Sequence, residues 1–114
     1  MASDVHAWIQ FGSGNTPIPR DGSVRIGRSI ESDLRLFQET SISRDHCVIR
    51  SHKGRLEVTD LGSRNGTRVN GRRIKEAMQL QHRDVVKVGE SELTVLLEIE
   101  PGSRGSTTEI PLMS

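Results

Sequence analysis

The sequence predicts an all-β domain, and three observations support this prediction. Short segments of alternating apolar and polar residues recur along the chain, turn residues separate them at close intervals, and convincing helix starts are missing. The chain has 114 residues, enough to bury one modest hydrophobic core but not a second folded unit. Many short strands with frequent turns fit an antiparallel β-sandwich or a β-barrel.

The expected strands follow one another along the chain. They are residues 7–11, 24–28, 34–36, 46–51, 55–61, 67–69, 85–89 and 92–99. Asn65-Gly66 and Asn70-Gly71 bracket the strand at 67–69, and both pairs are strong signals for two-residue turns because their residues accept positive φ. The segment 74–82 could be a helix, but it lacks a convincing cap, so a strand or a loop fits it equally well.

Period-two alternation assigns the residues that face the core. They are Ile26, Leu34, Leu36, Cys47, Ile49, Leu56, Val58, Val86, Val88, Leu93, Val95 and Leu97. After Ile99 the sequence changes to Gly, Ser, Thr and Pro, with almost nothing to bury. The folded domain is therefore expected to span residues 1–100, and residues 101–114 are expected to form a flexible tail or linker.

Composition excludes several classes of function. The net charge is +1, no apolar run is long enough to span a bilayer, and the N-terminus lacks the features of a secretory signal. The single cysteine, Cys47, cannot form an internal disulfide and is expected to be a small buried residue. We therefore expect an intracellular, cytoplasmic protein, or a nuclear one in a eukaryote, with no membrane partner.

Residues 64–75 form a strongly basic stretch. From Arg64 to Lys75 there are five basic residues and no acidic one, which indicates a local anionic partner. Aromatic residues, which stack on nucleic-acid bases, make up only 3% of the sequence. Nucleic acid is therefore not the expected partner.

The stretch "LGSRNGTRVNG" at residues 61–71 raises three alternatives. It could grip the phosphates of a nucleotide, connect strands through tight turns, or present polar side chains to a partner. The glycine spacing of residues 66–73 matches a Walker A loop, but the segment ends in Arg-Arg in place of Lys followed by Ser or Thr. The nucleotide interpretation fails, and the other two stay open.

Catalytic and metal sites are not expected either. Ser43, Asp45 and His46 are crowded together, but the chain contains no G-x-S-x-G nucleophile elbow. None of the four histidines has the spacing of a metal ligand, and His46 beside an apolar strand fits a structural role. We expect no enzyme activity, no cofactor and no metal.

Polar side chains suited to phosphate occur on three separate loops. Arg28 ends an expected strand, Ser43 and Arg44 precede another, and Arg64 and Asn65 head the first Asn-Gly pair. Loops at one end of a sandwich come together although they are distant in sequence. Guanidinium groups and a serine hydroxyl suit a doubly charged phosphate, and an asparagine amide can hold an extended peptide.

Four blocks of the sequence resemble the successive blocks of a forkhead-associated (FHA) domain. They are "IGR" at 26–28, "SISRDHCVI" at 41–49, "DLGSRNGTRVNG" at 60–71 and "LQHRDVVKVG" at 80–89. Their order and spacing match from about Trp8 to Ile99. The resemblance implies a β-sandwich of two twisted, mainly antiparallel sheets whose apical loops bind phosphothreonine, and it implies no catalysis.

The resemblance also assigns site residues by their positions in this sequence. It implies phosphothreonine and peptide binding by Arg28, Ser43, Arg44, Arg64, Asn65 and Asn70, and structural support by Gly27, His46 and Gly66. Arg28 would reach the phosphate, the hydroxyl and backbone of Ser43 would hold it, and Asn65 would bond the main chain of the peptide.

The expected partner is a threonine-phosphorylated protein. Arg64, Arg68 and Arg72 would favour acidic residues near the phosphothreonine. Thr107 or Thr108, if phosphorylated, could occupy the pocket of the same or a neighbouring molecule. The alternative is a phosphate-independent scaffold or assembly domain that uses a face of the sandwich.

Overall fold

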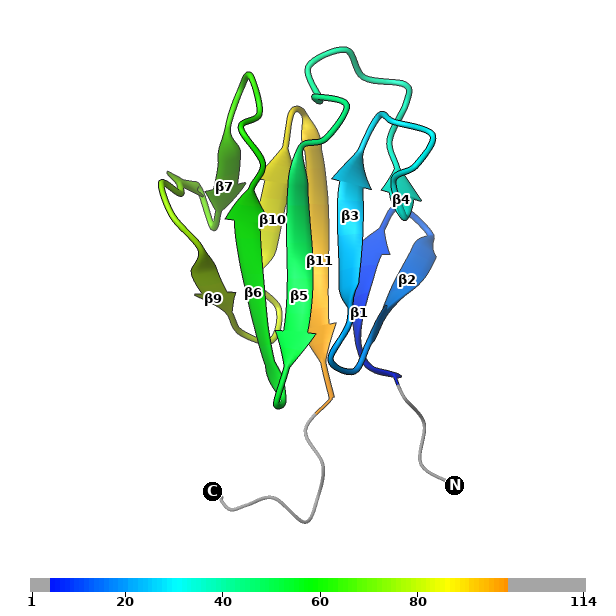
Figure 1. The fold of residues 1–114 in the computed structure, drawn as a ribbon, viewed down its shortest axis with the longest axis vertical. Coiled ribbons are helices and arrows are strands. Elements are labelled where there is room, and N and C mark those ends of the chain that lie inside the picture. Colours follow the sequence, from blue (N-terminus) through cyan, green and yellow to red (C-terminus); the bar gives the residue numbers. More distant parts are fainter. Residues whose placement is uncertain (1–4, 99–114) are drawn as a thin grey trace.

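The computed structural model describes residues 5–98, which form eleven strands and no helix (Figure 1). The strands are β1 (Val5–Phe11), β2 (Gly14–Pro19), β3 (Ser23–Gly27), β4 (Leu34–Arg35), β5 (Cys47–His52), β6 (Arg55–Asp60), β7 (Thr67–Val69), β8 (Arg72–Arg73), β9 (Met78–Leu80), β10 (Val85–Val88) and β11 (Ser91–Leu97). This range accordingly holds no helix long and apolar enough to cross a membrane. The expected tail, with Thr107 and Thr108, lies outside the described residues.

The strands form two sheets that pack face to face. The six-stranded sheet has the order β2-β1-β11-β10-β7-β8, and the five-stranded sheet has the order β4-β3-β5-β6-β9. All neighbouring strands are antiparallel except the short pair β3 and β4. The predicted all-β sandwich of two mainly antiparallel sheets is confirmed.

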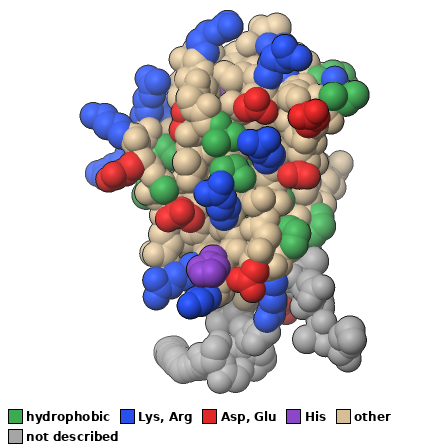
Figure 2. All heavy atoms as spheres, in the orientation of Figure 1, with side chains coloured by type: hydrophobic (Ala, Val, Ile, Leu, Met, Phe, Trp, Pro, Cys, Tyr) green, Lys and Arg blue, Asp and Glu red, His purple; other side chains and the backbone are tan. Residues whose placement is uncertain are grey.

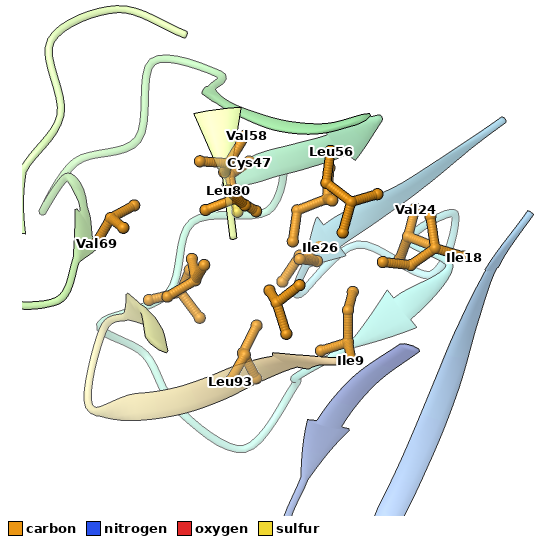
Figure 3. Close-up of a cluster of buried hydrophobic side chains, with 14 of the residues drawn as sticks. Ile9, Ile18, Val24, Ile26, Cys47, Leu56, Val58, Val69, Leu80 and Leu93 are labelled. Atoms are coloured by element: carbon orange, nitrogen blue, oxygen red, sulfur yellow. The ribbon is translucent and has the colours of Figure 1, made fainter. Parts of the chain in front are cut away.

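The core lies between the two sheets and follows the predicted alternation. Figure 3 shows side chains from both sheets meeting there, among them Ile9 and Leu93 from one sheet and Ile26 and Leu56 from the other. Of the twelve predicted core residues, all are buried except Leu34 and Leu97, which are half-buried and pack against the cluster. Burial of these apolar side chains stabilises the sandwich and holds its loops in place.

Three strands were not predicted from the sequence. β2 contains two prolines, which argue against an interior strand, but it lies at a sheet edge where proline is tolerated. β8 and β9 have only two and three residues, too few to show an alternating pattern. The segment 74–82 is therefore a short strand between loops and contains no helix.

The two Asn-Gly pairs behave differently. Asn70 and Gly71 have φ values of 51° and 89° and close the β7–β8 hairpin as predicted. At the first pair only Gly66 has a positive φ, of 83°. The prediction of a hairpin turn at Asn65-Gly66 is wrong, because this loop leads from β6 in one sheet to β7 in the other.

Several loops gather at one end of the sandwich. Figure 1 shows that the β3–β4, β4–β5 and β6–β7 loops lie at the same end. β1 begins and β11 ends at the opposite end. The predicted site residues Arg28, Ser43 and Asn65 belong to these three loops, one residue to each.

Candidate functional site

The β3–β4 and β4–β5 loops are joined next to Arg28. The Arg28 amide donates to the carbonyl of Ser43 and the Ser29 amide to that of Arg44, both at 3.1 Å. The Arg28 Nε donates to the carbonyl of Ile42 at 2.5 Å. These bonds bring the guanidinium beside Ser43 although the residues are distant in sequence.

Gly27 makes this close approach possible. A Cβ on Gly27 would overlap the carbonyl group of Arg44, so no larger residue fits without moving the backbone. Gly27 is buried at the end of β3 and has an ordinary negative φ, so its role is steric. Its predicted structural role has this physical basis.

His46 joins the loop of Ser43 to the β6–β7 loop. Its ring is fully buried. The Ser43 amide donates to His46 Nδ1 at 3.0 Å, and His46 Nε2 lies 2.8 Å from the carbonyl of Gly66. Because Nδ1 accepts a bond, Nε2 carries the proton and donates to Gly66. The Ser43 amide is therefore occupied within the domain.

Ser43 and Asn65 are also bonded across the loops. The Arg64 amide donates to Ser43 Oγ at 2.9 Å, which leaves the hydroxyl proton free to be donated to a ligand. Asn65 Nδ2 donates to the carbonyl of Ser41 at 2.8 Å. The exposed Asn65 keeps its amide oxygen without a partner among residues 5–98, and it can accept a bond from a peptide amide.

Asp60 organises the loop that carries Asn65. Its carboxylate accepts bonds from the amides of Gly62 and Ser63 and from the hydroxyls of Ser63 and Thr67, over 2.5–3.0 Å. Burial alone would raise the pKa of Asp60, but these bonds outweigh it and hold the pKa below its usual value. Asp60 was not among the predicted site residues, although an Asp two residues before a Gly is a signal for a turn closed by the side chain.

Glu39 anchors the β4–β5 loop to the β10–β11 turn. Its carboxylate accepts the amide of Glu90 at 2.8 Å and the hydroxyl of Ser91 at 2.9 Å. The bond from the Glu90 amide is the main cause that lowers the pKa of Glu39. Gly89 lets the turn approach, since a Cβ there would press on Ser41 and Ile42. Sequence reasoning missed this anchor because its two halves are about fifty residues apart.

The remaining predicted site residues differ in their surroundings. The side chains of Arg44 and Arg64 are exposed at the joined loops and have no polar partner within the described part of the chain. Asn70 instead bonds Asp84 through Nδ2 and the Val85 amide through Oδ1, each at 3.0 Å. Both ends of its amide are thus used to hold the β7–β8 hairpin.

Residues outside the joined loops offer little other chemistry. Burial raises the pKa of the Cys47 thiol to about 12, so the thiol is protonated and unreactive at neutral pH. Among the described side chains, those of residues 7–98, no three His, Cys, Asp or Glu residues are placed to share a metal ion. The site thus consists of hydrogen-bond donors, arginine charges and one free amide oxygen, which are groups suited to binding an anionic ligand.

A sandwich with ligand-binding groups on joined apical loops defines a recognition module. The model of the FHA domain family matches residues 24–89, and the chain belongs to this family. Over 93 residues it is 42% identical to the FHA domain-containing protein FhaA of Mycobacterium tuberculosis. The matched region makes up 82% of this chain and 17% of FhaA. The chain thus spans less than a fifth of the length of FhaA.

Solved structures agree with this assignment. An FHA domain from an analysis of phosphothreonine-dependent FHA domain interactions is 33% identical with a TM-score of 0.75, over 83% of this chain and 99% of that one. The FHA domain of FhaA, complexed with the intracellular domain of Rv3910, is 38% identical with a TM-score of 0.70, over 78% and 98% of the two chains. The resemblance seen in the sequence blocks is confirmed.

Proposed function

We propose that the chain is a recognition module that binds a threonine-phosphorylated segment of a partner protein at the loop end of the sandwich. The guanidinium of Arg28 and the hydroxyl of Ser43 take the phosphate. The amide of Asn65 bonds the main chain of the partner beside the phosphothreonine. The module acts by binding alone and makes or breaks no bond of its partner.

The observation that carries the proposal is the way Arg28 is fixed. Its Nε is held by the carbonyl of Ile42, whereas its two terminal nitrogens have no partner among the described residues. An arginine held by one nitrogen presents the rest of its planar fork in a set direction, which suits a phosphate dianion. The Ser43 hydroxyl proton and the exposed Arg44 and Arg64 add donors and charge next to it.

The relatives support a protein partner. One structural neighbour comes from work on phosphothreonine-dependent interactions, and another is bound to the intracellular domain of a second protein. The groove beside the site also fits an extended peptide. It is open, holds about 720 Å³, and its lining includes Ser41, Asn65 and Arg68.

Calorimetric titration tests the proposal. An oriented phosphothreonine peptide library selects a binding peptide, which is then compared with its unphosphorylated form. We expect binding only to the phosphorylated form, and Arg28→Ala should weaken it by about tenfold to over a hundredfold, because a charge-assisted hydrogen bond contributes roughly 1.5–3 kcal/mol. Arg55→Ala is the matched control, since Arg55 is an exposed arginine that begins β6 at the opposite end. Equal binding of both peptide forms would reject the proposal.

A specific observation also supports the alternative of a phosphate-independent scaffold. The strand register places Trp8 opposite both Pro17 and Leu96 on the outer face of the six-stranded sheet, because the neighbours Ala7 and Ile9 face the core. An assembly partner could bind this apolar group. Such binding would survive Arg28→Ala and would be lost in Trp8→Ser, so the two variants separate the two functions.

A further inference from the structure

A row of charged side chains crosses the outer face of the six-stranded sheet. Lys87 in β10 lies opposite Arg68 in β7, and Arg68 lies opposite Arg73 in β8. On the other side Lys87 lies opposite Glu92 in β11. Residues directly opposite on antiparallel strands are close neighbours on one face, and like charges there are destabilising. The row thus ends in two adjacent arginines.

In the described strands no carboxylate lies opposite either of these two arginines, although Glu90 and Glu92 line the same groove as Arg68. Lys87 has Glu92 opposite it, and its charge also helps to lower the pKa of Glu39. Arg68 makes only a long bond of 3.5 Å to the carbonyl of Gly71, and neither Arg68 nor Arg73 has an ion pair within residues 5–98. The repulsion between them is therefore retained in the folded state without an ion pair to offset it.

The same arginines lie next to the proposed site. The side chain of Arg73 packs over Gly66, where a Cβ would contact its Cδ, Nε and Cζ atoms. Gly66 directly follows Asn65, so the Arg73 guanidinium lies against the loop that would hold the partner's main chain. Arg68 and Asn65 line one groove together with Ser41. Figure 2 shows several Lys and Arg side chains, with acidic ones among them, at the edge of the molecule where β7 and β9 lie in Figure 1.

Arg72 differs from its neighbour Arg73 in direction. It lies opposite Val69, whose side chain is buried in the core, so Arg72 leaves β8 from the other face of the sheet. Of the three arginines that the sequence suggested for acidic neighbours, Arg72 is therefore turned away from the sheet face that carries Arg68. Arg73, which no sequence pattern indicated, shares that face with Arg68.

We infer that Arg73 and Arg68 form a second anion-binding site that reads an Asp or Glu side chain of the bound phosphopeptide, beside the residue held by Asn65. This inference rests on the proposed function. A carboxylate between the two guanidinium groups would accept charge-assisted bonds from both and would relieve their repulsion. The domain would then select phosphothreonine sites that have an acidic residue at one defined flanking position.

The test uses peptides that differ in one side chain. In the selected phosphothreonine peptide, Asp and then Asn are placed at each flanking position in turn, and the dissociation constants are measured. We expect one position at which Asp binds roughly three- to tenfold more tightly than Asn. Arg73→Gln, which keeps most of the stem over Gly66, should abolish this preference, and Arg72→Gln should leave it intact.

Two further measurements separate recognition from general charge or structure. A Lys at the same peptide position should bind Arg73→Glu more tightly than it binds the natural domain. The unfolding midpoint of Arg73→Gln should be unchanged or raised, because a repulsive neighbour is removed.

The outcomes are distinct. A similar loss of acid preference in Arg72→Gln and Arg73→Gln, or no preferred position at all, would overturn the inference but leave phosphothreonine binding in place. If the natural domain binds no phosphothreonine peptide, the proposed function itself fails, and the inference fails with it. A single-stranded oligonucleotide that binds through Arg68 and Arg73 more tightly than any acidic peptide would also overturn it.

Discussion

His46 illustrates how single residues set the geometry of the site. The buried imidazole joins the loop of Ser43 to the carbonyl of Gly66, so it fixes how far Ser43 lies from the loop that carries Asn65. Its two nitrogens have different roles, one as acceptor and one as donor. Few other side chains of this size can fill both roles in the same space.

Replacement of His46 should therefore affect both stability and binding. His46→Phe keeps the volume but leaves the Ser43 amide and the Gly66 carbonyl without their partner, and each unpaired buried group costs about 1–3 kcal/mol. We expect denaturant unfolding to show a loss of roughly 2–5 kcal/mol. Phosphopeptide binding of the folded fraction should also weaken. Unchanged affinity in a destabilised but folded His46→Phe would show that the bridge does not position Ser43.

At the scale of the loops and strands, close backbone contacts decide which elements can meet. β3 reaches the segment at Ser43 and Arg44 only because Gly27 has no side chain. Gly27→Ala should therefore push the β3–β4 and β4–β5 loops apart, lower the unfolding midpoint and weaken phosphopeptide binding by more than about tenfold. Gly14→Ala in β2 is the control, because its Cβ would meet nothing closer than 3.7 Å. Equal tolerance of both changes would contradict the steric role.

Two acidic side chains anchor the loops and make the fold sensitive to acid. The fold lowers the pKa of Asp60 from its usual value of 3.8 and that of Glu39 from its usual value of 4.5. Each carboxylate therefore stabilises the fold fully when the pH is above its usual pKa, and this contribution is lost as the pH falls through its lower pKa in the folded state. The unfolding free energy should fall below about pH 4. Asp60→Asn should lose roughly 1–3 kcal/mol at neutral pH and flatten this acid limb, as measured by denaturant unfolding at a series of pH values. An acid limb as steep as that of the natural domain would assign the sensitivity to other groups.

The sequence was sufficient for the pattern of strands but not for the contacts between loops. Alternating apolar residues identified the long strands and the core, and the spacing of Arg28, Ser43 and Asn65 identified the family. Arg73 was missed because its importance depends on strand register and on the packing over Gly66, neither of which shows in a local pattern. Asp60 was missed although its partners Gly62, Ser63 and Thr67 follow it closely in the sequence. Asn70 was placed among the binding residues by its position alone, and its bonds to Asp84 and Val85 are long-range contacts.

At the scale of the whole molecule, the site and the core are coupled through β5. Cys47 begins β5 directly after His46 and pairs with Asp60, so the strand that carries the buried thiol also connects two supports of the site. The thiol is fully buried, and its raised pKa of about 12 leaves almost no thiolate at neutral pH. An opening that exposes Cys47 should therefore also disrupt His46 and Asp60, and with them the phosphate-binding loops.

Alkylation of Cys47 should therefore report phosphopeptide binding. A ligand that binds only the closed domain stabilises it in proportion to its concentration, so at about 100 times the dissociation constant the alkylation rate should fall roughly a hundredfold. The unphosphorylated peptide should not slow the reaction. The phosphopeptide should slow it roughly ten- to a hundredfold less in Arg28→Ala than in the natural domain, and mass spectrometry can follow all three cases. Rapid labelling of the natural domain at saturating phosphopeptide would mean that Cys47 is reached by a local opening that leaves the site intact. In that case β5 would not couple the core to the loops.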